Sequence, residues 1–167
     1  MVDRTTGQSE QVVQTRPANL SEQEAVQQAE LVRYVTNRET YDPTDNRERI
    51  PAVERASVGQ ARESLVQLWS ARNGDQYPPT RYGRDTLITV KIASISILND
   101  TTAQVRFTRR RENPNEQPIE RDFVATVGFR FEPRTESRLE AVWRNPLGFE
   151  VTSYRVDAET LRPREAN

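Results

Sequence analysis

Cysteine and histidine are both absent from this chain of 167 residues. Without cysteine there are no disulfide bonds and no thiolate chemistry, although such a chain can still belong to an oxidising compartment. Without histidine the chain lacks the commonest general base and the commonest ligand of transition metals. Acidic residues are plentiful but scattered, with no calcium-loop pattern and no paired carboxylates in an apolar setting. The sequence therefore predicts no catalytic residue, no cofactor and no metal site.

Long hydrophobic runs are missing as well, since no stretch of about 18 apolar residues and no signal-peptide core occurs. The formal net charge is −1, from 24 basic and 25 acidic residues, and Lys91 is the single lysine. This balance gives no overall attraction to nucleic acid, so we expect no direct nucleic-acid binding. Both ends are polar, which predicts a linker over 1–19, one domain over 20–156 and a flexible tail over 157–167.

The first half of the chain has the period of helices. Ser21 opens a capping box with Glu24, and the pattern that follows predicts a helix to about Tyr41, where Asp42-Pro43 ends it. A second helix is predicted over 58–71, stopped by Asn73-Gly74. Between them we expect one short helix or irregular turns over 44–56, and after them a stiff loop over 75–84.

The second half has the period of strands. Within Thr86–Leu98 the apolar positions change parity near Ile92-Ala93, which is typical of a bulge or sharp bend. We expect Asn99-Asp100 to form a hairpin turn and the inward residues of the bent strand to be buried, namely Ile88, Val90, Ile95 and Ile97.

Three further strands complete the predicted sheet. Alternation over 103–108 and 123–131 predicts two of them, joined by a polar loop over 109–117, and a fourth runs through 139–143. Helices followed by an antiparallel meander predict an α+β fold, with the helices packed on a strongly bent four-stranded sheet as a cone. Its interior could hold a small ligand, but the predicted lining offers no acid or base, so a filled core is favoured. The arginines at 109–111 could bind phosphate, although a solvated hairpin tip is the preferred interpretation.

A turn motif follows the predicted fourth strand. In Asn145-Pro146-Leu147-Gly148-Phe149, a side-chain acceptor, a residue with fixed φ and a glycine occupy the first, second and fourth turn positions. We expect Gly148 to adopt a positive φ, as turn-closing glycines often do.

A candidate partner surface lies on the first predicted helix. At 100° per residue, Tyr34, Arg38 and Tyr41 project away from the apolar side of this helix, and Tyr154 follows the turn motif. Tyrosine and arginine are enriched at interface hot spots, so these four residues predict a weak homodimer surface. The alternative is that Tyr41 folds onto the following loop.

Several motifs together resemble the VirB component eight family of bacterial type IV secretion and conjugation systems. They are Val2-Asp3-Arg4-Thr5-Thr6-Gly7, then Arg33-Tyr34-Val35 with Arg38-Glu39-Thr40-Tyr41, and finally the turn motif with Val151, Thr152 and Tyr154-Arg155. The resemblance implies the periplasmic domain, with a nuclear-transport-factor-two-like fold, of a bitopic inner-membrane protein. It also implies that the membrane anchor precedes the first residue of this chain.

The function that this resemblance implies is a non-catalytic assembly factor, which joins itself and other secretion components at the periplasmic face of the inner membrane. The alternative is a small-molecule carrier or an isomerase-like enzyme on the same cone-shaped fold. That chemistry needs an acid or base facing the interior, so the lining of the interior discriminates between the two.

Overall fold

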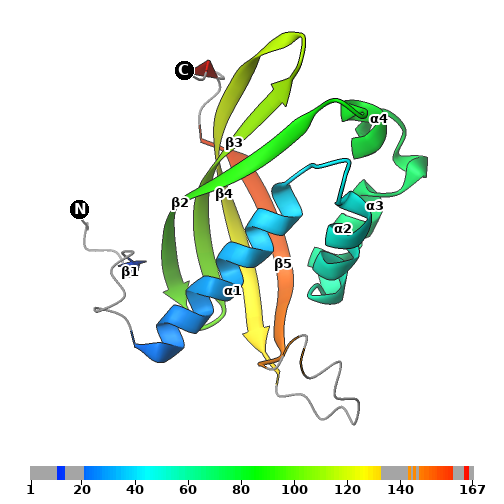
Figure 1. The fold of residues 1–167 in the computed structure, drawn as a ribbon. Coiled ribbons are helices and arrows are strands. Elements are labelled where there is room, and N and C mark those ends of the chain that lie inside the picture. The colour runs from blue at the N-terminus through cyan, green and yellow to red at the C-terminus, as the bar shows by residue number, and fades with distance from the viewer. Residues whose placement is uncertain are drawn as a thin grey trace.

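A computed structural model describes residues 11–13, 21–132, 143, 145, 147–159 and 164–165 of the chain. It confirms the α+β class, with helices first and an antiparallel sheet after them (Figure 1). The strand order is β1-β2-β3-β4-β5, and β6 pairs with β4. The helical elements are α1 (Glu22–Glu39), α2 (Asn46–Arg55), α3 (Gly59–Leu68), the 3-10 helix η2 (Ala71–Gln76) and α4 (Pro78–Tyr82). The strands are β1 (Gln11–Val13), β2 (Leu87–Asn99), β3 (Thr102–Asn113), β4 (Glu116–Phe131), β5 (Phe149–Ala158) and β6 (Arg164–Glu165).

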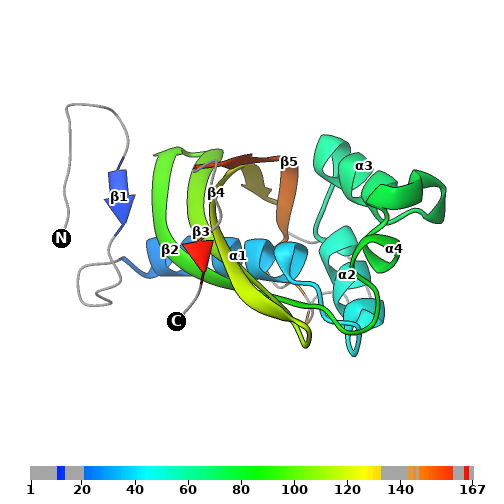
Figure 2. The same ribbon diagram turned by 90° about the horizontal axis from the view of Figure 1, so that it is seen from above.

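Helix α1 lies across one face of the sheet, while α2, α3 and α4 gather beside β5 and the start of β2 (Figures 1 and 2). Its predicted capping box is confirmed, because the Glu24 amide donates to Ser21 Oγ and the Ser21 amide donates to Glu24 Oε1. Leu31 and Val35 are fully buried against the sheet. Helix α1 is therefore fixed at its start by local bonds and along its length by packing.

The predicted bulge in β2 is confirmed. Ile92 pairs with Phe107 and Ser94 with Arg106, so that Ala93 is the extra residue. Ala93 itself is exposed rather than inward, because the bulge leaves it without a partner in β3. Of the four residues expected to be buried, Ile88 and Ile95 are, whereas Val90 and Ile97 are half-buried. The sheet twists without curling strongly, so the expected strong bend of the whole sheet is not found.

The predicted polar loop over 109–117 is wrong. β3 continues to Asn113 and β4 starts at Glu116, so the arginine run lies on a strand, where Arg109 is opposite Arg121. Charge suggested a loop, but the alternation of side chains continues through it. The stiff loop over 75–84 is also corrected, since it contains α4.

In the described part of the chain, the last strand of the meander follows the turn motif. β5 runs over Phe149–Ala158 and pairs with β4. Residues 139–142 of the predicted fourth strand lie outside the described residues, and Trp143 is helical and 71% exposed. β5 passes the predicted domain boundary at 156, β1 lies within the predicted linker, and β6 lies within the predicted tail.

The core occupies the face of the sheet that α1 covers. Its fully buried large side chains include Phe107, Phe129, Leu31, Leu65, Val105, Val127 and Val151. No helix in the described part of the chain is both long and apolar enough to cross a membrane.

Candidate functional site

The tyrosines of the predicted partner surface are inside the molecule. Tyr34 and Tyr41 are each 4% exposed and Tyr154 is 6% exposed. The prediction that these side chains form an exposed surface is therefore wrong. Helix α1 has a second buried side, because α2 and α3 lie against it and Tyr34 points into that contact. Sequence periodicity could not show this, because the position of α2 and α3 is a property of the folded chain.

Tyr34 and Arg38 join α1 to α2 and α3. The Tyr34 hydroxyl lies 2.7 Å from Ser57 Oγ and accepts from Arg38 Nη1 at 2.8 Å. Arg38 also donates to the Ala61 carbonyl at 3.0 Å and to Ser64 Oγ at 2.9 Å. Its guanidinium thus bridges α1 and α3.

Glu39 brings a carboxylate into the interior, which the sequence analysis did not predict. It accepts a 2.7 Å hydrogen bond from the Tyr154 hydroxyl and pairs with Arg109 at 3.2 Å. Burial raises the pKa of Tyr154 well above its usual value of 10.0, and the charge of Glu39 raises it further. The phenol stays protonated and donates, so Glu39 is held between a phenol and a guanidinium and is not open to a substrate.

Tyr41 does fold onto the following segment, as the alternative interpretation held. Its hydroxyl donates to the Gly83 carbonyl, and its ring stacks on Trp69 with centroids 6.3 Å apart. Burial raises the pKa of the Tyr41 phenol too, and the nearby phenols of Tyr77 and Tyr82 raise it further.

The turn motif closes against the end of β4. The Gly148 amide donates to the Asn145 carbonyl at 3.0 Å, and the Asn145 side chain exchanges two hydrogen bonds with the Phe149 backbone. Gly148 has a φ of +64°, as expected, and its carbonyl accepts from the Glu132 amide at 2.8 Å. An added Cβ at Gly148 would lie 1.6 Å from the Glu132 carbonyl oxygen. Pro146 lies outside the described residues, and Leu147 is 45% exposed.

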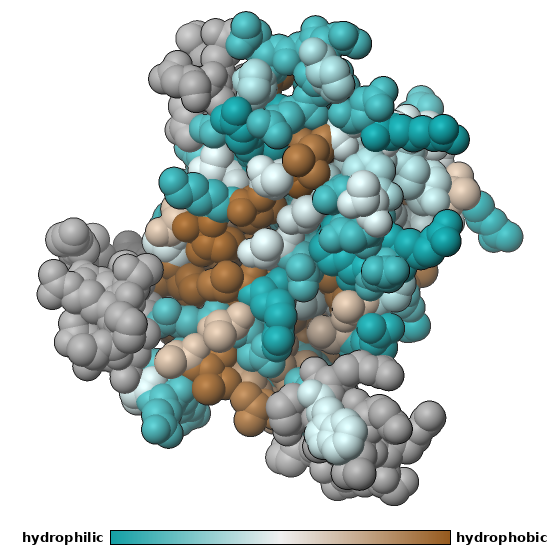
Figure 3. All heavy atoms as spheres, in the orientation of Figure 1, coloured by the Kyte–Doolittle hydropathy of each residue, from teal (hydrophilic) through white to brown (hydrophobic). Residues whose placement is uncertain are grey.

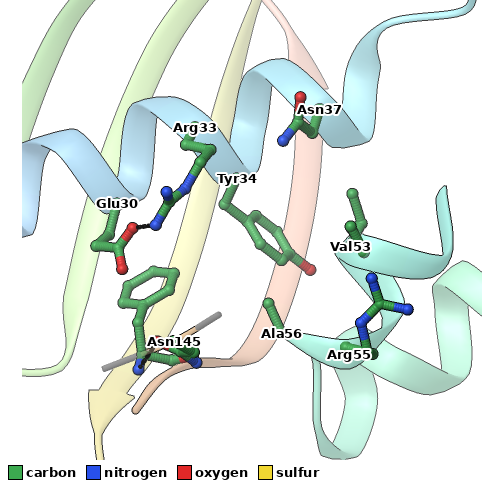
Figure 4. A pocket seen from close by; sticks show the side chains of 10 residues that line it. Glu30, Arg33, Tyr34, Asn37, Val53, Arg55, Ala56 and Asn145 are labelled. Carbon is green, nitrogen blue, oxygen red and sulfur yellow. Dashed lines mark hydrogen bonds and ion pairs between the residues drawn. The ribbon is translucent and has the colours of Figure 1, made fainter. Parts of the chain in front are cut away.

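Beside this turn, a groove of about 430 Å³ runs between α1 and α2 (Figure 4). The α1 side contributes Glu30 and Arg33, which form an ion pair, and the lining also includes Tyr34 and Phe149. Asn145 of the turn motif also lines the groove. No group of three acidic, cysteine or histidine side chains that could hold a metal ion occurs within the described ranges.

A second surface feature lies on the opposite side of α1, toward β2. Figure 3 shows apolar side chains gathered in a band where α1 crosses β2. The half-buried apolar residues of these two elements that pack against the core are Val32, Val90, Ile92 and Ile97, which we call the apolar band. The three β2 residues face the same side as the core, but α1 covers them incompletely.

Comparisons with known proteins agree with this fold. A family model described as "VirB8 protein" matches residues 1–159. The type IV secretion system protein PtlE of Bordetella pertussis is 33% identical over 165 residues, which are 97% of this chain and 69% of PtlE. The type IV secretion system protein virB8 of Brucella suis is 34% identical over 134 residues, 77% of this chain and 54% of that protein.

Solved structures give the same result. The structure of Agrobacterium tumefaciens VirB8 superposes with a TM-score of 0.78 at 25% identity, covering 86% of this chain and 98% of that one. A TrwG component from Bartonella birtlesii has a TM-score of 0.73 at 29% identity, with coverage of 85% and 96%. TraE in complex with 2-(2-furyl)isonicotinic acid has a TM-score of 0.67 at 29% identity, with coverage of 84% and 100%.

Proposed function

Because the chain belongs to the VirB8 family of type IV secretion proteins, and has the nuclear-transport-factor-two-like fold, we propose that it is a non-catalytic scaffold of such a system. In this role it contacts copies of itself and other secretion components at the periplasmic face of the bacterial inner membrane. The membrane-anchored context is part of the proposal and comes from the family resemblance.

The observation that carries the proposal is the half-buried apolar band beside α1. Contiguous apolar surface on a folded domain marks sites of protein contact more often than chance exposure does. Val32, Ile92 and Ile97 come from two elements and pack only partly against the core, which leaves a part of each side chain for a partner to cover. The interior supports the same role, because its ionisable groups contact one another: Glu39 is bonded to Tyr154 and Arg109.

Self-association through the apolar band replaces the tyrosine surface as the proposed contact. A homodimer would use the same patch on both copies. We expect weak association of the isolated chain, at roughly 10–1000 μM, since anchoring in a membrane would raise the effective concentration to about millimolar.

Sedimentation over that concentration range tests the proposal. Val32→Glu should abolish self-association, because it places a charge in the apolar band, while Val66→Glu on the far helix α3 should leave it unchanged. Val66 is 44% exposed and provides a matched substitution away from the band. A wild-type chain that stays monomeric throughout, or equal effects of the two variants, would overturn self-association at this surface.

The scaffold role itself is tested in a secretion-competent strain. Restoring the full-length gene with Glu39→Gln, a variant that keeps the shape of the side chain, should support secretion wherever the protein still folds and accumulates. An isomerase or carrier that uses an interior carboxylate would lose its function in that variant even when the protein is folded. Loss of secretion by a well-folded Glu39→Gln protein would favour the enzyme alternative.

A further inference from the structure

Four arginines surround a small cleft at the far end of the sheet, beyond the C-terminal end of α1. The cleft has a volume of about 150 Å³ and lies between α4, the start of β2 and the β3–β4 hairpin, which Figure 1 shows extending past α1. We call it the arginine cleft. Its lining consists of Arg81, Arg109, Arg111 and Arg121 together with Tyr82, Ile88, Ile119 and Phe123.

Strand register forces the charges together. Arg109 and Arg121 are directly opposite one another on β3 and β4, on the same face as the Phe107–Phe123 pair of the core. Like charges directly opposite each other in an antiparallel pair are destabilising. Arg111 follows two residues after Arg109 and therefore points to the same side. The register thus places two like charges opposite each other at this end of the sheet.

The carboxylates that the structure describes in contact with these arginines are fewer than the arginines. Arg109 pairs with Glu39, and Arg111 lies 3.7 Å from Glu116. Arg81 and Arg121 form no ion pair with a described residue; Arg81 contacts the neutral amide of Gln76. Among the described ion pairs, the four guanidinium groups of the cleft thus meet two carboxylates.

Hydrogen bonding is incomplete in the same place. The Nε atoms of Arg109 and Arg121 are buried and have no acceptor among the described residues. Buried donors without acceptors are rare in folded proteins, and each one calls for an explanation. A ligand that carries oxygen acceptors would satisfy both, once the guanidinium groups turn about their terminal torsions.

The floor of the cleft selects the kind of anion. The apolar lining residues Tyr82, Ile119 and Phe123 are half-buried. The guanidinium of Arg109 lies over the Phe123 ring, 4.5 Å from the ring centroid. A free phosphate has no apolar part to cover such a floor. A peptide with two acidic side chains on either side of an aliphatic one offers both chemistries, because carboxylates bind guanidinium groups in pairs of hydrogen bonds.

We propose that the arginine cleft binds an acidic segment of a partner protein, in which two carboxylates flank an apolar residue. The proposal rests on the scaffold role in that it supplies one partner contact, on a face distinct from the apolar band. It also explains why like charges are retained where they oppose folding.

The test is titration of the chain with a labelled peptide in which two aspartates flank a leucine. Arg121→Gln should weaken binding at least about tenfold, the effect expected for losing one charged hydrogen-bonded contact. Arg81→Gln on the exposed helix α4 provides a second variant. Arg155→Gln on β5 is the matched control, because Arg155 is 74% exposed and pairs with Asp157 away from the cleft.

Two additional measurements separate specific binding from its rivals. Arg121→Gln should raise the melting temperature while it weakens binding, whereas a merely structural arginine would lower it. Inorganic phosphate should compete with the peptide only weakly. Absence of peptide binding, equal loss in Arg155→Gln, or phosphate that binds as tightly as the peptide would each overturn the proposal. Self-association in sedimentation should be unchanged in Arg121→Gln, so failure here is distinguishable from failure of the scaffold role.

Discussion

The two ends of the same sheet face are built in opposite ways. At the end covered by α1, polar side chains are paired: Tyr34 with Ser57 and Arg38, and Tyr154 with Glu39. At the other end, Arg109 and Arg121 face each other across two strands and their Nε donors have no described acceptor. At the first end, the buried polar groups find their hydrogen-bond partners within the molecule, which is what stability requires. The second end keeps two buried donors that have no described acceptor, which makes it a candidate for function.

The largest expected effect comes from a substitution in the turn motif, near the end of the sheet that α1 covers. Gly148→Val should lower the free energy of unfolding by about 3 kcal/mol or more, because it combines a positive φ with a Cβ placed against the Glu132 carbonyl. Urea unfolding measures this. Gly83→Val is the matched control, since Gly83 has a φ of +75° but nothing within 4 Å of an added Cβ. Equal losses in both variants would show that the clash with Glu132 contributes nothing.

A smaller effect comes from removing one buried hydroxyl. Tyr154→Phe leaves the Glu39 carboxylate without the phenol donor and should cost about 1–3 kcal/mol. Tyr77→Phe is the control, because its hydroxyl makes no hydrogen bond within the described structure, and it should cost far less. If the two variants have the same melting temperature, the Tyr154–Glu39 hydrogen bond does not stabilise the folded chain.

The same phenol gives a dependence on pH. The pKa of Tyr154 is raised in the folded state by burial and by Glu39, so its contribution to stability is fully present below the unfolded pKa of about 10. As pH rises above that value toward the folded pKa, this contribution is lost, by up to about 1.4 kcal/mol per pH unit. Unfolding measured between pH 9 and pH 11 should therefore show a shallower decline for Tyr154→Phe than for the wild type. Parallel declines would contradict the assignment.

The smallest expected effect is a gain in stability, and it comes from a substitution in the arginine cleft. Arg121→Gln should increase the free energy of unfolding by about 0.5 kcal/mol, because it removes one of two opposed charges. Arg130→Gln on the same strand is the control, since Arg130 pairs with Glu150 at 2.9 Å and should lose stability slightly. A loss of stability in Arg121→Gln would mean that the charges of the arginine cleft are already compensated in the folded chain.

Much of the fold could be read from local patterns. The capping box at Ser21, the bulge near Ala93 and the glycine of the turn motif were all predictable, because each depends on a few neighbouring residues. The position of the last strand was not, since alternation before Asn145 looked as strand-like as alternation after it. Choosing between them requires knowing which segment reaches the free edge of β4.

The sequence by itself determined the helix starts, the bulge, the turn and the family to which the chain belongs. Only the tertiary structure decided that Tyr34 and Tyr154 are buried and that Arg109 and Arg121 are opposed. The reason is physical: a helix pattern identifies one buried side, but α2 and α3 bury a second side of α1 from far along the chain. In the same way, opposition of charges depends on the register between two strands, and no single stretch of sequence contains that register.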